Sequence, residues 1–466
     1  MRWSCVSVGM VLAAALAGCA TAVHNLPGNQ PLAGEGSAAV EAGIATGAAD
    51  PAYNDDLLIG LSFSGGGTRA AAFAFGVLTE FDRSRLSRGG DAVALSDRID
   101  FISGVSGGSV TAAYFGVKKR AGLADFRERF LLKNAEESLV THISAGTLAR
   151  GLAGGVNTGD FPRWLDQNLF EGATFGQLRA DRRPRIWINA SDIYNRTPFV
   201  FGRTAFSILC SDLNSYKIAD AVAASAALPV VFAPIVIESF AEKCRAPLPG
   251  WAEKARRDPN APPMLKAFAN GLERYRDGSV KYIKLLDGGL VDNFGLSGFT
   301  IARQSAEQPY EPLTPEQAVK LRRALFLVVD AGRAPSGDWA TTLEGPAGAD
   351  LIMAAADTAI DAGVRASYAA FERTNADWQA ELIRWRCRLS AAERRRLGAG
   401  PNWNCRDVRF HIGRIGFDQL GAARAAALDA VPTRFRLPPE QVELVIGAGQ
   451  EALRASTAFR AFMRGL

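Results

Sequence analysis

The chain has 466 residues, with 53 basic and 48 acidic residues and a formal net charge of +5. This length accommodates one large α/β domain with an appendage, or two domains. Hydrophobic residues make up 48% and charged residues 22%, which excludes wholesale disorder and a polytopic membrane protein. Two short arginine clusters, at 182–185 and 394–396, each adjoin an acidic residue, so we expect solvated surfaces there and no nucleic-acid partner.

The N-terminus has the layout of a signal peptide. Arg2 precedes a short apolar run, Val6 to Leu16, which is followed by Ala-Gly and then Cys19. The run is too short to span a bilayer as a stable helix. The segment resembles the lipobox of bacterial lipoproteins, which implies removal of residues 1–18 and attachment of acyl chains such as palmitate to Cys19. Because Ala20 rather than Asp follows, the resemblance favours the outer membrane, facing the periplasm. An ordinary secretory signal is the alternative.

The remaining cysteines suit an oxidising compartment. Four are left after Cys5 and Cys19, and four cysteines permit three pairings. The pairing that we favour joins Cys210 to Cys244 and Cys387 to Cys405. No C-x-x-C spacing occurs, and the histidines are few: His24, His142 and His411. We therefore expect no structural metal site and no cofactor.

Elements alternate along the middle of the chain. Residues 19–54 are rich in Gly, Ala and Pro without periodicity, which is typical of a flexible tether. Apolar runs predict strands at 57–64, 101–103, 185–190, 198–201, 280–286 and 325–329, and helices at 68–81 and 110–119. This order predicts a three-layer α/β/α fold with a mainly parallel central sheet. The charged segment 240–277 is expected to be a loop insertion, and residues beyond 335 a mostly helical extension, with helices at 347–389 and from 418 to the end.

The first strand runs into a glycine-rich loop, Ser64-Gly65-Gly66-Gly67-Thr68-Arg69. Consecutive glycines leave backbone N–H groups unshielded, and the following helix adds positive potential at its N-terminus. The loop can therefore stabilise a phosphate or a tetrahedral oxyanion. A nucleotide site is disfavoured, because neither Gly-x-x-x-x-Gly-Lys-Ser/Thr nor Gly-x-Gly-x-x-Gly is present.

The second predicted strand runs into Gly104-Val105-Ser106-Gly107-Gly108. This Gly-x-Ser-x-Gly pattern lies between a strand and a helix, where a sharp turn pushes the serine Oγ outward. Ser106 is the expected nucleophile.

A carboxylate follows a later strand, in Asp287-Gly288-Gly289. Residues at the carboxyl ends of strands point into the region where open α/β sheets bind ligands. Asp287 is the expected base, although Asp-Gly is also a frequent turn. Asp292 is a competing carboxylate.

Together these motifs resemble the patatin-like phospholipase family, in which an oxyanion loop, a nucleophile elbow and an Asp-Gly-Gly motif occur in this order. Residues 224–229, Ala-Ser-Ala-Ala-Leu-Pro, are similar to a further block of the family. The resemblance covers about 57–331 and sets a hydrolase domain at 55–335, followed by the C-terminal helical extension at 336–466. This chain departs from the family where Ser64 and Ala70 replace Asp and Gly, and where Gly295 replaces Pro.

The resemblance implies a serine lipid acyl hydrolase with a Ser106–Asp287 dyad, acting on a phospholipid or lysophospholipid. Backbone N–H groups of the loop and the elbow form the oxyanion hole, and Arg69 braces the loop; the hole residues are Gly65, Gly66, Gly67 and Gly107. An aspartate of ordinary pKa, about 3.9, is a weak base, so Asp287 needs a partly desolvated site.

Two other functions are compatible with the sequence. In a Ser-His-Asp α/β-hydrolase, His411 would be the base, with Asp330 available before it in the chain. His411 lies in a short alternating segment, 409–412, which favours a structural role in a strand. The other function is a catalytically silent lipid-binding envelope lipoprotein. Retention of Ser106, Asp287 and the glycines argues against it, because the fold alone needs only some of them.

Overall fold

The computed structural model describes residues 25–33, 56–88, 91–138, 160–180, 183–229, 232–335 and 337–464. The signal peptide, Cys19, His24, His142 and most of the expected tether lie outside these ranges. Among the helices in the described ranges, none is both long and apolar enough to cross a membrane.

The centre of the molecule is an eight-stranded mixed sheet of order β10-β9-β1-β4-β5-β8-β7, with β6 paired to β5. The pairings from β10 to β5 are parallel, whereas β8, β7 and β6 pair in the antiparallel sense. A separate hairpin joins β2 to β3. The strands are β1 (Leu57–Phe63), β2 (Arg85–Arg88), β3 (Asp91–Ala94), β4 (Phe101–Val105), β5 (Arg185–Asp192), β6 (Thr197–Val200), β7 (Ile235–Glu238), β8 (Tyr282–Asp287), β9 (Arg323–Asp330) and β10 (Arg409–Gly416).

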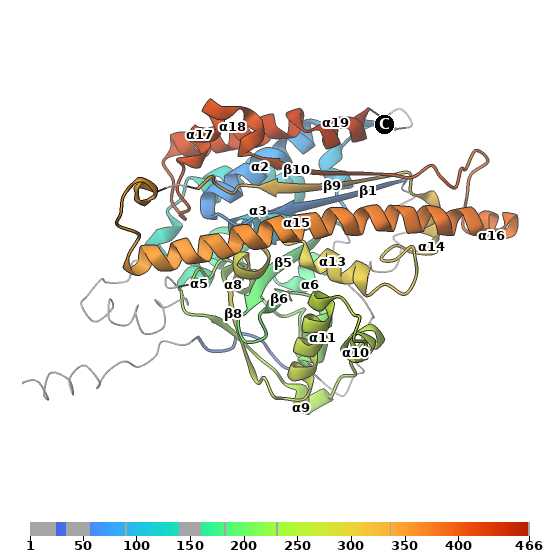
Figure 1. Cartoon of the computed structure of the whole chain (residues 1–466), viewed down its shortest axis with the longest axis horizontal. Helices are drawn as coiled ribbons and strands as arrows, with labels where there is room; N and C mark the ends of the chain where they lie inside the picture. The colour runs from blue at the N-terminus through green and yellow to red at the C-terminus, as the bar shows by residue number, and fades with distance from the viewer. Residues whose placement is uncertain are drawn as a thin grey trace, which may run out of the picture.

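Helices cover both faces of the sheet, as the apolar runs predict (Figure 1). The helices are α2 (Gly67–Arg83), α3 (Gly107–Lys118), α5 (Asp160–Leu165), α6 (Phe175–Ala180), α7 (Arg203–Ile208), α8 (Ile218–Ser225), α9 (Ala241–Cys244), α10 (Gly250–Arg257), α11 (Pro263–Arg276), α12 (Gly289–Asp292), α13 (Ser297–Gln304), α14 (Pro315–Lys320), α15 (Gly348–Arg388), α16 (Ala391–Arg396), α17 (Ala422–Asp429), α18 (Pro439–Ala455) and α19 (Thr457–Met463).

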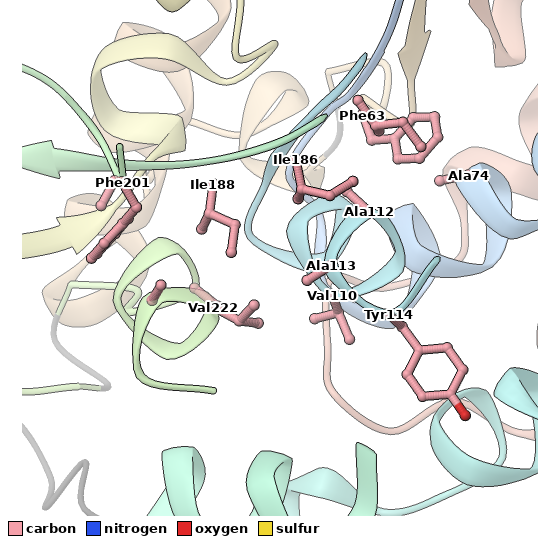
Figure 2. Close-up of a cluster of buried hydrophobic side chains, with 14 of the residues drawn as sticks. Phe63, Ala74, Val110, Ala112, Ala113, Tyr114, Ile186, Ile188, Phe201 and Val222 are labelled. Carbon is pink, nitrogen blue, oxygen red and sulfur yellow. The ribbon is translucent and has the colours of Figure 1, made fainter. Parts of the chain in front are cut away.

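Side chains of β9 alternate between two cores, one on each face of the sheet. Leu325 and Leu327 face a core shared with α2, α3, α8, α18 and α19, whereas Phe326 faces a core shared with α13 and α15. Figure 2 shows part of the first core, where side chains of β1, α2, α3, β5 and α8 come together. A sheet buried on both faces explains the nearly continuous apolar runs of its parallel strands.

The segment 240–277 was expected to be a loop, and this expectation is wrong. It contains α9, α10 and α11. Leu265, Ala269 and Leu272 recur at helical spacing on α11 and are buried, as expected for the inward face of an amphipathic helix. The high charge of the segment hid this apolar stripe. The strand β7 just before it was also missed, because Ile235–Glu238 is short and follows a proline.

The C-terminal region is mostly helical and is built into the sheet. Its strand β10 extends the parallel part of the sheet beside β9. Its helix α18 crosses α2 so closely that a Cβ on Gly76 would lie 2.2 Å from the carbonyl oxygen of Ile446. The favoured disulfide pairing is confirmed: Cys387 is bonded to Cys405, and Cys210 to Cys244.

Residues 25–33, part of the expected tether, lie against the main body. The backbone of this segment pairs with the 210–212 loop, where Asp212 N–H donates to the carbonyl of Gln30 at 2.8 Å. Side chains as well as backbone hold it, which composition does not reveal.

Candidate active site

Ser106 occupies a sharp turn between β4 and α3. Its φ of 50° and ψ of −124° lie outside the regions that L-residues favour, so the surroundings must hold the turn. The Ser106 N–H donates to the Ser225 hydroxyl at 2.9 Å, and that hydroxyl donates to the carbonyl of Asn189 at 2.6 Å. Ser106 is 4% exposed. Residues from α8 and β5 therefore fix the backbone of the elbow.

The elbow and the glycine loop touch through their backbones. A Cβ on Gly107 would lie 1.9 Å from the carbonyl oxygen of Gly67, and a Cβ on Gly65 would lie 3.3 Å from the Ser106 Cβ. Glycine at 107 thus allows the N-termini of α3 and α2 to meet beside Ser106. Two converging helix N-termini create positive potential at this point.

Asp287 lies beside Ser106 at the end of β8. Its carboxylate accepts the Gly289 N–H at 2.8 Å and lies within interaction range of the Ser106 hydroxyl. Its own N–H donates to the carbonyl of Ala227 at 2.8 Å. Burial raises the pKa of Asp287 to about 6, against the opposing effect of the Gly289 N–H and the Ser106 hydroxyl. Asp287 as a whole residue is 7% exposed, so its carboxylate has the desolvated setting that a carboxylate base needs.

Asp287 reaches the site by a different route from the one that the sequence suggested. The strand β8 runs antiparallel to β5, so its carboxyl end is not one of the parallel carboxyl ends. Asp287 pairs with Ala190, and the preceding Asn189 pairs with Val105, the neighbour of Ser106. β8 therefore starts beyond the carboxyl ends of the parallel strands and runs back toward them. Ser106 and Asp287 meet at the boundary between the parallel and the antiparallel strands.

The glycine-loop N–H groups differ in their engagement. The Gly65 N–H donates to the Asn293 carbonyl at 3.2 Å and lies 3.1 Å from its side-chain oxygen. The Thr68 N–H donates to the carbonyl of Arg434 at 2.8 Å. Gly66 and Gly67 lie between them at the start of α2, where N–H groups have no intrahelical acceptor. The geometry favours Gly66, Gly67 and Gly107 over Gly65 as oxyanion donors.

Arg69 is 3% exposed and connects the loop to two other segments. Its Nε donates to the carbonyl of Ala331 at 3.0 Å, and Nη1 to the carbonyl of Val431 at 2.8 Å. Burial lowers the pKa of Arg69 to about 9, and the charge of Arg333 adds to this effect. Arg69 thus braces the loop against the end of β9 and the C-terminal region.

The competing residues lie in other roles. The buried Asp292 carboxylate accepts the Ser297 N–H at 2.5 Å at the start of α13. His411 pairs in register with Leu325 in the middle of β10, three strands from β4. Three strand spacings and an offset of about six residues separate it from Ser106 by roughly 25 Å. Asp330 forms an ion pair with Arg414 at 2.8 Å. The structure does not bring a Ser106–His411–Asp330 triad together.

Several supporting residues were not singled out by the sequence reasoning. Ser225 lies within the Ala-Ser-x-Ala-x-Pro block, and Asn293 follows the Asp-Gly-Gly motif, so both had a motif as a signal. Asn189 had none, because an asparagine within a buried strand is informative only once its partners are known. Gly295 has a φ of 67°, which proline cannot adopt. The departure from the family at this position therefore reflects the local backbone.

The chain was compared with protein families, curated sequences and solved structures. A sequence profile of the family described as patatin-like phospholipase matches residues 61–300, more than half of the chain. Curated protein sequences give no match. Among solved structures, the human GIVD cytosolic phospholipase A2 is similar with a TM-score of 0.38 and 12% sequence identity. The alignment covers 88% of this chain and 63% of that chain. The chain belongs to the patatin-like phospholipase family of lipid acyl hydrolases.

Proposed function

We propose that the protein is a lipid-anchored serine hydrolase of the phospholipase A or lysophospholipase type, with Ser106 as nucleophile and Asp287 as base. One observation carries the proposal. The Ser106 hydroxyl, on a strained elbow between two helix N-termini, lies beside a buried carboxylate whose pKa is raised to about 6. A serine held only for structure needs neither feature.

The reaction follows from these groups. Ser106 Oγ attacks the ester carbonyl carbon as its proton passes to Asp287. The oxyanion forms at the N–H groups of Gly66, Gly67 and Gly107, and each such donor contributes about 3 to 4 kcal/mol in comparable sites. The bond to the alcohol then breaks, and Asp287 returns the proton to the leaving oxygen. Water attacks the acyl-enzyme with Asp287 again as base, and Ser106 recovers its proton.

Covalent trapping tests the nucleophile. A fluorophosphonate should label the wild-type protein on the peptide that contains Ser106 and should not label Ser106→Ala. Fatty-acid release from phosphatidylcholine and from lysophosphatidylcholine then assigns the substrate class. A folded wild-type protein that neither reacts nor releases fatty acid would support the silent lipid-binding alternative.

The location is a separate part of the proposal. Cys19 follows an apolar run that resembles a lipoprotein signal, and it supports anchoring to the outer membrane on its periplasmic side, with the membrane surface and its lipids as partners. A clickable palmitate analogue should label the wild-type protein but not Cys19→Ala. The matched control is Cys5→Ala, which removes a cysteine within the predicted signal peptide and should leave labelling intact.

A further inference from the structure

The segment 25–33, here called the strap, lies alongside β7, the edge strand at the antiparallel end of the sheet. Asn29 is buried, and its side chain satisfies both backbone groups of Glu238: Nδ2 donates to the carbonyl at 2.8 Å, and Oδ1 accepts the N–H at 2.9 Å. Asn25 Nδ2 donates to the carbonyl of Pro234 at 2.8 Å. The strap therefore occupies the place of a further strand partner.

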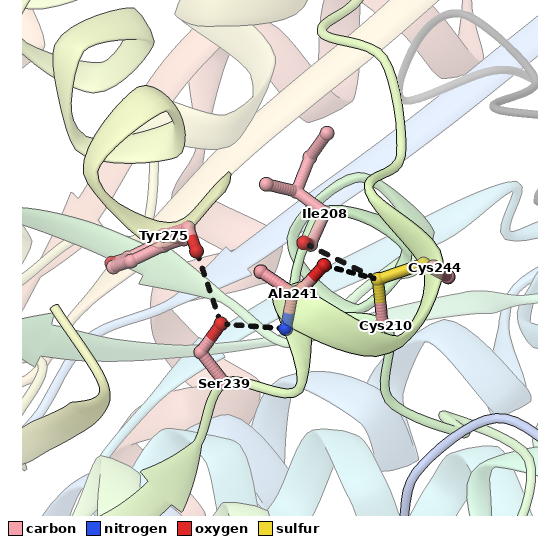
Figure 3. Close-up of a disulfide and its surroundings, with 6 residues drawn as sticks. All are labelled: Ile208, Cys210, Ser239, Ala241, Cys244 and Tyr275. Atoms are coloured by element: carbon pink, nitrogen blue, oxygen red, sulfur yellow. Dashed lines mark hydrogen bonds between the residues drawn. A yellow bond between two sulfur atoms is a disulfide. The ribbon is translucent and has the colours of Figure 1, made fainter. Parts of the chain in front are cut away.

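The other end of the strap binds a loop that a disulfide secures. Leu32 N–H donates to the carbonyl of Cys210 at 2.9 Å, and Asn29 Nδ2 donates to the Ser211 hydroxyl at 2.9 Å. Figure 3 shows Cys210 bonded to Cys244, with Ser239 and Tyr275 fixing the neighbouring turn. The receiving surface is thus covalently braced, and the strap has a defined binding site.

The strap begins close to the catalytic residues. Asn25 binds Pro234, which directly precedes Ile235, and Ile235 pairs with Leu285, two residues before Asp287. One strand spacing and one hydrogen bond therefore separate Asn25 from the level of Asp287, a distance on the order of 10 Å. In Figure 1, α5 and α8 lie at the end of the molecule toward which β9 points, which is the end that carries the site.

Docking of the strap reduces the number of residues between Cys19 and the first point of contact with the folded body. The first strand begins at Leu57, but the strap begins at Asn25, six residues after Cys19. Six residues span at most about 20 Å. If the strap were not docked, the linker would run from Cys19 to the first strand at Leu57, and its maximum length would be several times greater. Leu26, the second residue of the strap, is 81% exposed, which places an apolar side chain where the chain leaves the body.

We propose that the strap holds the catalytic edge of the sheet against the bilayer that carries the anchor, so that the enzyme acts on lipids of its own leaflet. This inference rests on the lipid anchor of the proposed function. The occupant of the surface beside Leu26 is the bilayer, because the chain that leaves the strap there reaches its acylated residue within about 20 Å.

Paired insertions test the strap. One variant carries a twelve-residue Gly/Ser segment between Val23 and His24, before the strap; its control carries the same segment between Gly43 and Ile44, after the strap. Each lipidated protein is reconstituted in phosphatidylethanolamine–phosphatidylglycerol vesicles. Hydrolysis of vesicle lipid is measured beside hydrolysis of a soluble butyrate ester. Energy transfer from a dye on Tyr194→Cys to a bilayer dye gives a readout that does not depend on activity.

The insertion before the strap triples the length of the linker between Cys19 and the strap, so the effective concentration of the enzyme at its own bilayer should fall about fivefold. Vesicle-lipid hydrolysis and energy transfer should both decrease, with ester hydrolysis unchanged. The insertion after the strap should change none of them. In an Asn25→Ala/Asn29→Ala background, which undocks the strap, the two insertions should become equivalent.

Equal effects of the two insertions in the wild-type background would overturn the inference. A wild-type protein without lipid on Cys19 would overturn the inference and the anchor together. If the wild-type protein hydrolyses neither substrate, the hydrolase proposal fails, and energy transfer alone decides whether the strap orients the body.

Discussion

The parallel part of the sheet and its antiparallel end contribute differently to the site. From the parallel strands β1 and β4 come backbone turns: the glycine loop and the elbow of Ser106. From the antiparallel strand β8 comes one side chain, Asp287. The turns are local products of their own sequence, because glycine spacing and the following helix define them. The position of the carboxylate depends on the register of β8 against β5, which no single segment determines.

The supporting contacts are of two kinds. Backbone-to-backbone approaches, such as that between Gly107 and Gly67, bring the two turns together. Side-chain hydroxyl groups bridge segments: Ser103 donates to the carbonyl of Gly295 at 2.7 Å and Ser191 to the carbonyl of Asp287 at 2.8 Å, and Ser225 links β5 to the elbow. Oxyanion stabilisation is therefore expected to tolerate no added volume, whereas the base is expected to respond to loss of hydrogen bonds.

Removal of either catalytic group should have the largest effect. Ser106→Ala and Asp287→Asn should each lower kcat by about 10⁴-fold or more, because the attacking oxygen or its proton acceptor is lost. Circular dichroism should show an unchanged fold. Asp292→Asn is the matched control and should keep catalysis. Activity that survives in Asp287→Asn but is lost in Asp292→Asn would reassign the base.

Acidic pH should protonate the Asp287 carboxylate and so lower activity, while the oxyanion hole stays in place. The pKa of Asp287 is raised to about 6 by burial, and the base acts in its ionised form. We expect kcat/KM on a neutral ester to be constant above pH 7 and to fall tenfold per pH unit below about pH 6. An apparent pKa near 4 would mean that the site is well solvated in the free enzyme.

Ser225→Ala should weaken the bridge between the two regions. The Ser225 hydroxyl accepts the N–H of Ser106 and donates to Asn189, so its loss leaves two buried polar groups without their partner, at about 1–3 kcal/mol each. We expect kcat to fall about tenfold, with KM nearly unchanged. Ser225→Thr supplies the control, since it keeps the hydroxyl. If Ser225→Ala retains full kcat, the elbow does not need this support.

The free energy of unfolding should depend on the cost of burying the ionised Asp287 carboxylate. The folded-state pKa of Asp287 lies above its ordinary value of 3.8, so ionisation costs free energy of folding as pH rises from about 4 and is fully expressed above 6. Asp287→Asn should therefore raise the free energy of unfolding at pH 8 by up to about 3 kcal/mol, and by little at pH 4. Urea unfolding at both pH values measures the difference. If wild type and Asp287→Asn are equally stable at pH 8, burial of the ionised carboxylate does not destabilise the fold.

The smallest effect is expected at the far edge of the parallel region. His411 lies on β10, away from the dyad, and burial lowers the pKa of its imidazole. His411→Ala should keep kcat/KM within about an order of magnitude of wild type, with any loss due to packing against Phe462. The double variant with His142→Ala should behave alike. A collapse of activity in a folded His411→Ala protein would favour the triad mechanism.

Local sequence determined much of the protein. Apolar runs with glycine-rich ends predicted β1, β4 and β9 and the helices after the first two, because strand, turn and helix signals there lie within a few residues. The nucleophile elbow and the glycine loop were readable for the same reason. The tertiary structure decided the rest. It reversed β8, brought Asn189 and Ser225 to the elbow, engaged the Gly65 N–H with Asn293 and docked residues 25–33 on β7. Each of these depends on contacts between segments far apart in the chain. Ser225 and Asn293 lie in or near motifs, but the motifs do not indicate which distant segments these residues contact.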